Sequence, residues 1–164
     1  MEKECRNIIE IAEGPTVCGD EFESDGKIST ECKACSAKTW VRLPFEEALS
    51  DTRGALLDQG FGIICELDMQ RMFKEKLGAD SSPYTVLGVC MPDQFHQALE
   101  QEKDFGLLIP CNVVVYEQGD GSIIETVDPV SLLSVMDGHK LESIAQEIKQ
   151  RLKSVVARVA GKAA

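Results

Sequence analysis

The segment from residue 84 to residue 116 contains two apolar runs separated by one amphipathic stretch. The first run predicts a strand that ends at Cys90, and Pro92 then opens a helix, because proline suits the first helical turn. The second run predicts a buried strand that begins at Cys111. The two cysteines are therefore expected at the strand ends that flank the helix, with His96 one turn into that helix.

Strand and helix patterns alternate before this segment. A strand is predicted at residues 37–43, and the helix that follows it ends at Gly60. A short apolar strand at residues 62–67 precedes a second helix, which Asp68 caps and Gly78 ends. The chain thus places two strands and two helices ahead of residue 84.

The remainder of the chain contains a hairpin and two helical segments. Asp120-Gly121 predicts a two-residue hairpin turn, and Asp128-Pro129 starts a helical turn. Apolar residues then recur at intervals of three and four, at Leu141, Ile144, Ile148, Leu152, Val155 and Val159. This seam predicts an amphipathic terminal helix that packs on its own domain by default, with a dimer contact as the alternative. The whole pattern predicts an α+β fold with a mostly antiparallel sheet and helices packed on one side.

The length and composition suit one domain with extensions. The chain has 164 residues, of which 43% are hydrophobic, enough for a core. We expect a Cys-containing extension at residues 1–36, an α+β domain at residues 37–136, and a C-terminal helix and tail at residues 137–164. No apolar run approaches the roughly 20 residues that span a bilayer, and the charged start does not resemble a secretory signal. The sequence therefore predicts a soluble, cytoplasmic protein.

The charge and the cysteine count exclude two classes of protein. The net charge of −11 argues against nucleic-acid binding, since a surface that contacts phosphates is basic. Seven cysteines are an odd number, and the chain carries no secretory signal, so a disulfide framework is disfavoured. Reduced thiols or a metal site are the better interpretation.

Four of the seven cysteines lie in the N-terminal extension, at Cys5, Cys18, Cys32 and Cys35. The last two form a CxxC pair of the kind that supplies half of a structural zinc site, while two widely spaced thiols would supply the other half. Redox use of the pair is disfavoured because a strand follows it, and the spacing matches none of the usual iron–sulfur runs. Binding of zinc or a related ion and loose reduced thiols both remain open.

The motifs PFEEAL, QGFGIICELDM, FKEKLG, YTVLGVCMP, GLLIPCNVVVYE and the later Asp-Pro pair follow one another over residues 37–136. In this order they resemble the prokaryotic family catalogued as domain of unknown function 302, to which no activity is assigned. The resemblance implies a small α+β fold of the TATA-binding-protein-like class, a homodimer, and no DNA binding. The family's recurrent positions fall on Gly60, Phe61, Asp68, Gly88, Cys90, Pro92, His96, Pro110, Cys111, Asn112 and Pro129. One departure is Met91, where the family usually has an asparagine.

Two thiols in the central segment are candidate reactive groups. Cys90 precedes a helix by two residues, and the positive end of a helix lowers a cysteine pKa and so favours a nucleophile. The alternative is that Cys90 simply packs at the strand end, since free cysteine is among the most buried residue types. Cys111 alone reads as a core position on the face that its strand shares with Val113 and Val115.

His96 and Asn112 are the polar candidates beside these thiols. His96 would serve as a base for either thiol, or bind a metal ion with both of them if the three side chains converge. The alternative for His96 is a surface or half-buried packing residue. Asn112 points to the opposite face from Cys111 and either orients a ligand or forms a structural hydrogen bond.

The sequence carries none of the motifs of the common enzyme classes, such as a phosphate loop, a dinucleotide fingerprint or a serine elbow. The favoured hypothesis is a homodimeric protein that binds a small ligand or a metal ion, with Cys90, His96, Cys111 and Asn112 as candidate ligand-binding residues. The alternative is a thiol-dependent enzyme or redox sensor that uses Cys90 or Cys111 with His96. A third hypothesis is an interaction module that works through the sheet or the terminal helix.

Overall fold

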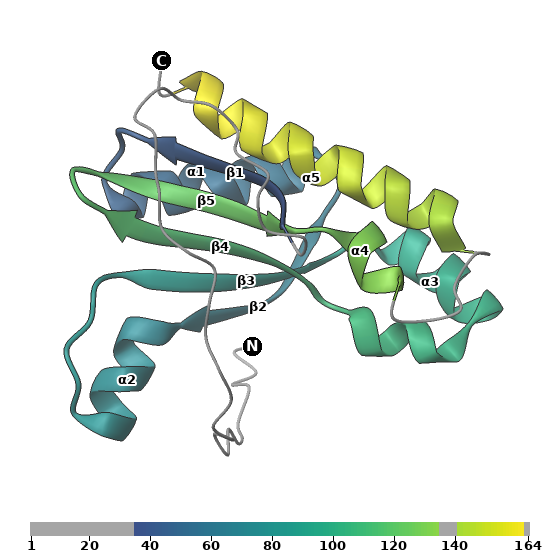
Figure 1. Cartoon of the computed structure of the whole chain (residues 1–164), viewed down its shortest axis with the longest axis horizontal. Helices are drawn as coiled ribbons and strands as arrows, with labels where there is room; N and C mark the ends of the chain where they lie inside the picture. The colour runs from purple at the N-terminus through teal and green to yellow at the C-terminus, as the bar shows by residue number, and fades with distance from the viewer. Residues whose placement is uncertain (1–34, 135–140, 163–164) are drawn as a thin grey trace.

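The computed structural model describes residues 35–134 and 141–162 (Figure 1). In chain order the elements are β1 (Cys35–Val41), α1 (Phe45–Asp58), β2 (Gly62–Asp68), α2 (Met69–Leu77), β3 (Tyr84–Cys90), α3 (Pro92–Gln101), the 3-10 helix η1 (Lys103–Leu108), β4 (Cys111–Gln118), β5 (Gly121–Val127), α4 (Pro129–Leu133) and α5 (Glu142–Lys162). The strands form one five-stranded sheet in the order β1-β5-β4-β3-β2, and every neighbouring pair is antiparallel. The predicted α+β class is confirmed.

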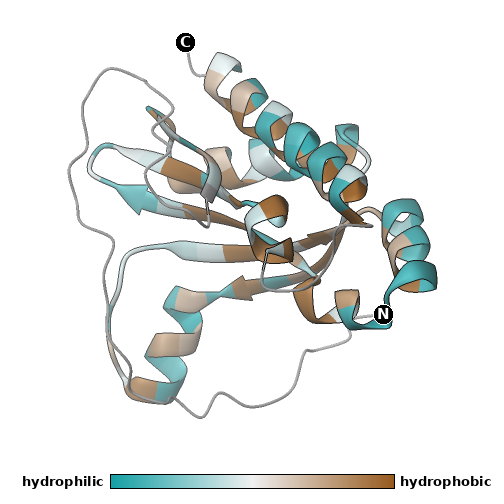
Figure 2. Ribbon diagram, turned by 45° about the vertical axis from the view of Figure 1, so that its right-hand side comes forward, coloured by the Kyte–Doolittle hydropathy of each residue, from teal (hydrophilic) through white to brown (hydrophobic). Residues whose placement is uncertain are grey.

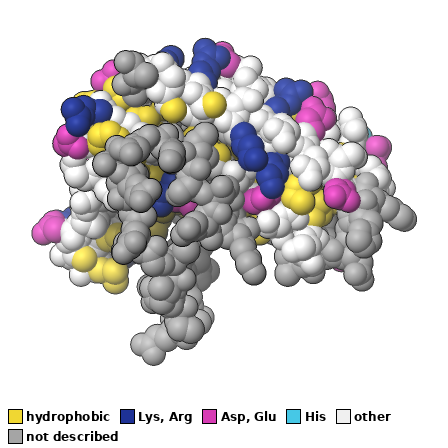
Figure 3. All heavy atoms as spheres, turned by 45° about the horizontal axis from the view of Figure 1, so that its top comes forward, with side chains coloured by type: hydrophobic (Ala, Val, Ile, Leu, Met, Phe, Trp, Pro, Cys, Tyr) yellow, Lys and Arg dark blue, Asp and Glu magenta, His cyan; other side chains and the backbone are white. Residues whose placement is uncertain are grey.

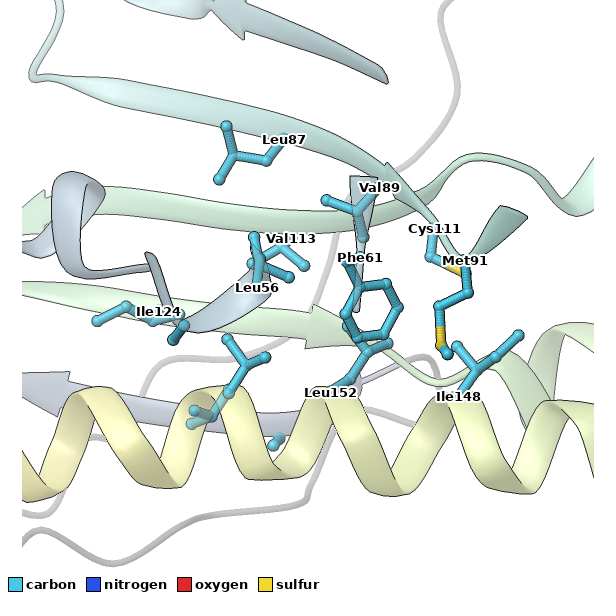
Figure 4. Packing of buried hydrophobic residues seen from close by; sticks show 14 of the residues in the cluster. Leu56, Phe61, Leu87, Val89, Met91, Cys111, Val113, Ile124, Ile148 and Leu152 are labelled. Carbon is cyan, nitrogen blue, oxygen red and sulfur yellow. The ribbon is translucent and has the colours of Figure 1, made fainter. Parts of the chain in front are cut away.

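One face of the sheet forms the hydrophobic core. Leu87 of β3, Val113 of β4 and Ile124 of β5 are all fully buried and point to this face. Leu56 of α1 and Leu152 of α5 enter the same cluster from the helices (Figure 4). Side chains alternate between the two faces of a strand, so this packing leaves the other half of the sheet residues on the opposite face.

The terminal helix α5 packs along its predicted seam. All six seam residues are buried, and the helix shows hydrophobic and hydrophilic stripes in Figure 2. Its polar side reaches α1 through ion pairs, with Arg158 at 2.5 Å from Asp58 and Lys162 at 2.7 Å from Asp51. Figure 3 shows basic and acidic side chains lying beside one another on this side of the molecule. The prediction that α5 packs on its own domain is therefore confirmed.

The predicted helix ends are observed. Asp68 caps α2, because its Oδ1 accepts a hydrogen bond of 2.9 Å from the backbone N–H of Arg71. Gly78 ends α2 and Gly60 follows α1, with φ of 65° and 83°, a conformation that glycine adopts without steric cost. These caps fix where the chain returns to the sheet.

The hairpin turn lies one residue earlier than predicted. Gln118 pairs with Gly121, so the two turn residues are Gly119 and Asp120, and Gly119 takes the positive φ of 64°. Gly121 is the first residue of β5, and a Cβ on it would meet the backbone oxygen of Val41 and lie 2.7 Å from the ring of Trp40. The prediction was wrong because this glycine serves close packing between strands, which the local sequence does not reveal.

Candidate functional site

The two central thiols lie at one end of neighbouring strands. Val89 of β3 pairs with Cys111 of β4, so Cys90 is the next residue beyond that pair. Both thiol side chains are buried, with 7% of Cys90 and 6% of Cys111 exposed. The structure therefore brings the two cysteines to the same end of the sheet, at the strand ends where the sequence predicts them.

Burial controls the chemistry of these thiols. It raises the pKa of Cys90, although the residue lies just before α3. It also raises the pKa of Cys111 to about 11, and the charge of a Cys90 thiolate contributes to that increase. The direction is opposite to the lowering that the start of α3 would produce, and its cause is desolvation of the thiolate. Both thiols are therefore protonated at neutral pH and are poor nucleophiles in this conformation.

His96 lies apart from the thiols. Its side chain is 76% exposed, and its Nδ1 lies 3.9 Å from Oε2 of Glu100, one turn later on α3. The neighbouring Phe95 and Ala98 supply the face of α3 that packs on the protein, which turns His96 to solvent. Across residues 35–134 and 141–162, no three His, Cys, Asp or Glu side chains are grouped so as to hold a metal ion. The convergence of His96 with Cys90 and Cys111 is therefore not formed in this structure.

Asn112 lies on the opposite face of β4 from Cys111, as the strand alternation predicts. It pairs across the sheet with Gly88 of β3, and its side chain is exposed. An exposed amide is hydrated, so Asn112 does not need the buried hydrogen-bond partner that a core position would require. Its position leaves it accessible to a ligand at the sheet surface.

A third thiol, Cys65 of β2, lies on the same face as Asn112, with Gly88 of β3 between them. Cys65 pairs with Gly88, and its Sγ occupies the space above that glycine, 2.5 Å from where a Cβ would stand. The ring of Pro110, which follows a cis peptide bond, closes the same space, with its Cγ 2.8 Å from that position. Cys65 is half-buried, and it is not among the candidate residues that the sequence pattern indicates. A glycine inside a strand pattern was the available signal, because such glycines often mark a close approach.

The face of the sheet away from the core carries its own cluster of polar and aromatic side chains. We call it the open face, and it comprises Lys38, Trp40, Cys65, Leu67, Tyr84, Val86, Asn112, Val114, Tyr116, Ile123 and Glu125. The buried residues of α1 and α5 belong to the core on the other side, and α2 has no buried residue. The described helices therefore bury their apolar side chains on the other face, while on the open face Ile123 is buried and Val86 and Val114 are half-buried.

Charge and stacking organise the middle of the open face. The rings of Tyr84 and Tyr116 stack with centroids 5.1 Å apart, and Nζ of Lys38 lies 3.6 Å from Glu125. Burial acts to lower the pKa of Lys38, but its hydrogen bond with Tyr116 and the charge of Glu125 raise it overall. Burial raises the pKa of Tyr84, and Tyr116 and Glu125 add to the increase. Lys38 is therefore protonated at neutral pH and forms an ion pair with Glu125 on this surface.

The chain is similar in sequence and in structure to proteins of one family. Residues 37–159 match the family described as domain of unknown function DUF302. The chain belongs to this family. The crystal structure of an uncharacterized conserved DUF302 protein from Bacillus stearothermophilus is similar, with a TM-score of 0.69 and 28% identity, over 74% of this chain and 94% of that chain. Among curated proteins, none matches the sequence.

The DUF302 match extends beyond the motifs that carry the resemblance in the sequence. It continues to residue 159 and so includes most of α5, whereas the motifs end near residue 136. Cys5, Cys18, Cys32 and Cys35 all precede the matched residues. The first three lie outside the described residues, and Cys35 is the first residue of β1.

The departure from the DUF302 pattern at Met91 has a structural consequence. Met91 is the N-cap of α3 but makes no side-chain capping hydrogen bond. Its side chain instead packs in the core, where Figure 4 shows it with Cys111 and Ile148. At the position where the resemblance implies an asparagine, this chain therefore has an apolar contact to α5. None of the helices in the described ranges is long and apolar enough to cross a membrane.

Proposed function

We propose that this DUF302 chain is a cytoplasmic binding protein for a metal ion, zinc or a related ion, held by Cys5, Cys18, Cys32 and Cys35. The observation that supports the proposal is the position of Cys35, whose backbone pairs with Val127 at the edge of the sheet. A ligand residue anchored in a sheet loses less conformational entropy on binding than one in a free loop. Four thiols also suit zinc, which is commonly bound by cysteine sulfur in structural sites.

The buried thiols of the central segment are poorly suited to bind a metal ion, which supports the N-terminal extension as the metal site. A thiol must lose its proton to bind a metal ion, and burial works against that for Cys90 and Cys111. His96, the expected third ligand, is exposed on α3. The N-terminal cysteines are the thiols that remain for a four-ligand site.

Elemental analysis by mass spectrometry tests the proposal on the full chain, purified without added metal or chelator. Cys32→Ser removes one proposed ligand, and Cys111→Ser is the matched control that removes a thiol from the central segment. We expect about one equivalent of metal in the unaltered protein and in Cys111→Ser, and loss of the metal in Cys32→Ser. Absence of bound metal, or loss only in Cys111→Ser, contradicts the proposal.

A second candidate function is a thiol-dependent enzyme or redox sensor that uses Cys90 and Cys111. The supporting observation is that Val89 pairs with Cys111, so that Cys90 and Cys111 lie at the same end of neighbouring strands. In this candidate His96 would have to approach the thiols from the surface of α3. Timed alkylation with iodoacetamide at neutral pH tests it: rapid labelling of one thiol is expected, and slow labelling of both in the folded protein contradicts it.

We also propose that the protein is a homodimer that binds neither nucleic acid nor membrane. The net charge of −11 opposes contact with phosphates or anionic lipids. The edge strand β2 and helix α2 expose Ile64, Leu67 and Leu77, which suits contact with a second copy. Light scattering coupled to size exclusion is expected to give twice the mass of one chain, and a monomer at micromolar concentration contradicts the dimer.

A further inference from the structure

The open face is an extended half-buried surface with aromatic and aliphatic side chains at its centre. Val86, Val114 and Tyr116 lie there on adjacent strands, between Trp40 on one side and Cys65 on the other. All three side chains are half-buried, and none of them belongs to the core cluster on the other face. A sheet face of this kind normally buries its apolar area against another layer.

We propose that the N-terminal segment of the same chain, residues 1–34, docks across the open face and forms that layer. The segment precedes β1, and β1 carries Lys38 and Trp40 on the open face. The occupant is therefore joined covalently to the surface that it covers.

The length of the segment is sufficient for this docking. An extended chain rises about 3.3 Å per residue, so the residues between Ile11 and Cys35 reach about 80 Å. Crossing five strands spaced by about 4.8 Å requires only about 20 Å. A tethered segment has an effective concentration in the millimolar range, whereas a separate molecule pays for lost translational and rotational freedom. The tether favours this segment over a second copy as the occupant.

The composition of the segment matches the surface in two respects. Its apolar cluster, at Ile8, Ile9 and Ile11, supplies aliphatic groups for the aromatic and aliphatic centre of the open face. Its acidic residues outnumber its basic residues, which suits contact with Lys38 and Arg42 at one side of the face. Each of these two side chains also has an acidic neighbour, Glu125 for Lys38 and Asp120 for Arg42. Arg42 lies 5.8 Å above the ring of Trp40, so this charge stands next to the apolar surface.

This inference does not depend on the metal proposal. Docking is carried by the apolar cluster near residue 10, and every variant below keeps all seven cysteines. Docking of residues 1–34 on the open face and binding of a metal ion are therefore measured separately, so failure of one proposal is distinguishable from failure of the other.

Photocrosslinking within the full chain tests which occupant covers the face. Val86→p-benzoylphenylalanine places the crosslinker at the centre of the open face, and Asn112→p-benzoylphenylalanine places it at an exposed position on the same face. Leu57→p-benzoylphenylalanine is the control, because Leu57 is exposed on the solvent side of α1. Crosslinked products are separated by mass and mapped by peptide mass spectrometry.

We expect both open-face variants to crosslink to peptides from residues 1–34 at the mass of one chain, and the control to give no such product. Products at the mass of two chains, or a yield no greater than that of the Leu57 control, overturn the proposal. The Asn112 variant keeps the test decisive if the large crosslinker at Val86 prevents folding.

A second measurement removes the apolar contact. Ile9→Asp combined with Ile11→Asp is expected to lower the crosslinking yield from Asn112→p-benzoylphenylalanine about tenfold, because a charged side chain opposes burial on an apolar surface. The same change is expected to shift the emission of Trp40, the single tryptophan, to longer wavelength. Thr16→Ala with Ser24→Ala is the control, because it lies outside the apolar cluster and leaves the charge of the segment unchanged. An unchanged yield and emission in the isoleucine double variant contradict docking by this cluster.

Discussion

Gly88 of β3 allows β2 and the residue before β4 to pack closely against its backbone. Cys65 of β2 and Pro110, which precedes β4, both occupy the space where a Cβ of Gly88 would lie. Any larger residue at this position must displace a sulfur atom and a proline ring from the end of the sheet where Cys90 and Cys111 lie. The packing at this end of the sheet therefore requires a residue without a side chain at position 88.

We predict that Gly88→Ala lowers the free energy of unfolding by about 1–3 kcal/mol, the usual cost of overpacking a buried site. Urea denaturation measures the loss. Gly54→Ala is the matched control, because Gly54 lies in the exposed interior of α1 with no atom near its Cβ position. That control is expected to raise stability by about 0.5–1 kcal/mol through helix propensity. A neutral Gly88→Ala contradicts the close approach.

The Cys111 thiol gives a second prediction at the scale of one residue. Its pKa rises from an ordinary value of 9.0 to about 11 on folding, so the folded state holds its proton more tightly than the unfolded chain. Its stabilising contribution is present below pH 9 and is lost as the pH rises towards 11. We predict that unaltered protein loses about 2–3 kcal/mol more than Cys111→Ala over this range, measured by urea denaturation. Equal losses in both proteins contradict a buried, protonated thiol.

Asp128 joins two helices to the end of β5. Its Oδ1 accepts a hydrogen bond of 2.9 Å from the backbone N–H of Val130 and so caps α4, while Oδ2 lies 2.5 Å from Nζ of Lys149 on α5. Burial acts to raise the pKa of Asp128, but the hydrogen bonds from Lys149, Ser131 and Val130 outweigh it and lower the pKa. One carboxylate therefore positions α4 and anchors α5.

We predict that Asp128→Ala lowers the free energy of unfolding by about 2–4 kcal/mol, because it removes the cap and leaves Lys149 half-buried beside an apolar residue. Asp128→Asn keeps a capping oxygen and is expected to cost about half as much. The lowered pKa means that the carboxylate stabilises the fold above its unfolded pKa and loses that effect as the pH falls. The gap between Asp128→Asn and unaltered protein should therefore shrink near pH 2, and a pH-independent gap contradicts the ion pair.

At the scale of the whole molecule, α5 is part of the same core as the sheet. Leu152 of α5 is fully buried in the cluster that contains Leu87 and Val113, whereas the ion pairs from α5 to α1 lie at the surface. Burial of apolar area contributes far more free energy than exposed ion pairs do. The described domain is therefore expected to unfold as one unit.

We predict that Leu152→Ala lowers the free energy of unfolding by about 2–5 kcal/mol, the usual cost of a cavity in a core. The fluorescence of Trp40 on β1 and the helical circular dichroism should report the same denaturation midpoint, because sheet and helix share this core. Arg158→Ala, which removes only an exposed ion pair with Asp58, is expected to cost less than about 1 kcal/mol. Separate midpoints for the two signals in Leu152→Ala would show that α5 melts independently.

The sequence predicted the elements well where the signal is local. The ends of α2 follow from Asp68 as an N-cap and Gly78 in a left-handed conformation, and the buried seam of α5 follows from its three- and four-residue spacing. The hairpin register was missed because Gly121 is required by Trp40 of β1, a residue far away in the chain. Contacts of that kind are not encoded in any short window of sequence.

The candidate site was predictable only in part, for the same reason. Residue order determined that Cys90 and Cys111 lie at strand ends and that Asn112 faces away from Cys111, because strand alternation and turn positions are local properties. Tertiary packing alone decided that both thiols are desolvated, that His96 faces solvent, and that Cys65 rests on Gly88. Burial and the pairing of distant strands set those outcomes, and both depend on how the whole chain closes around its core.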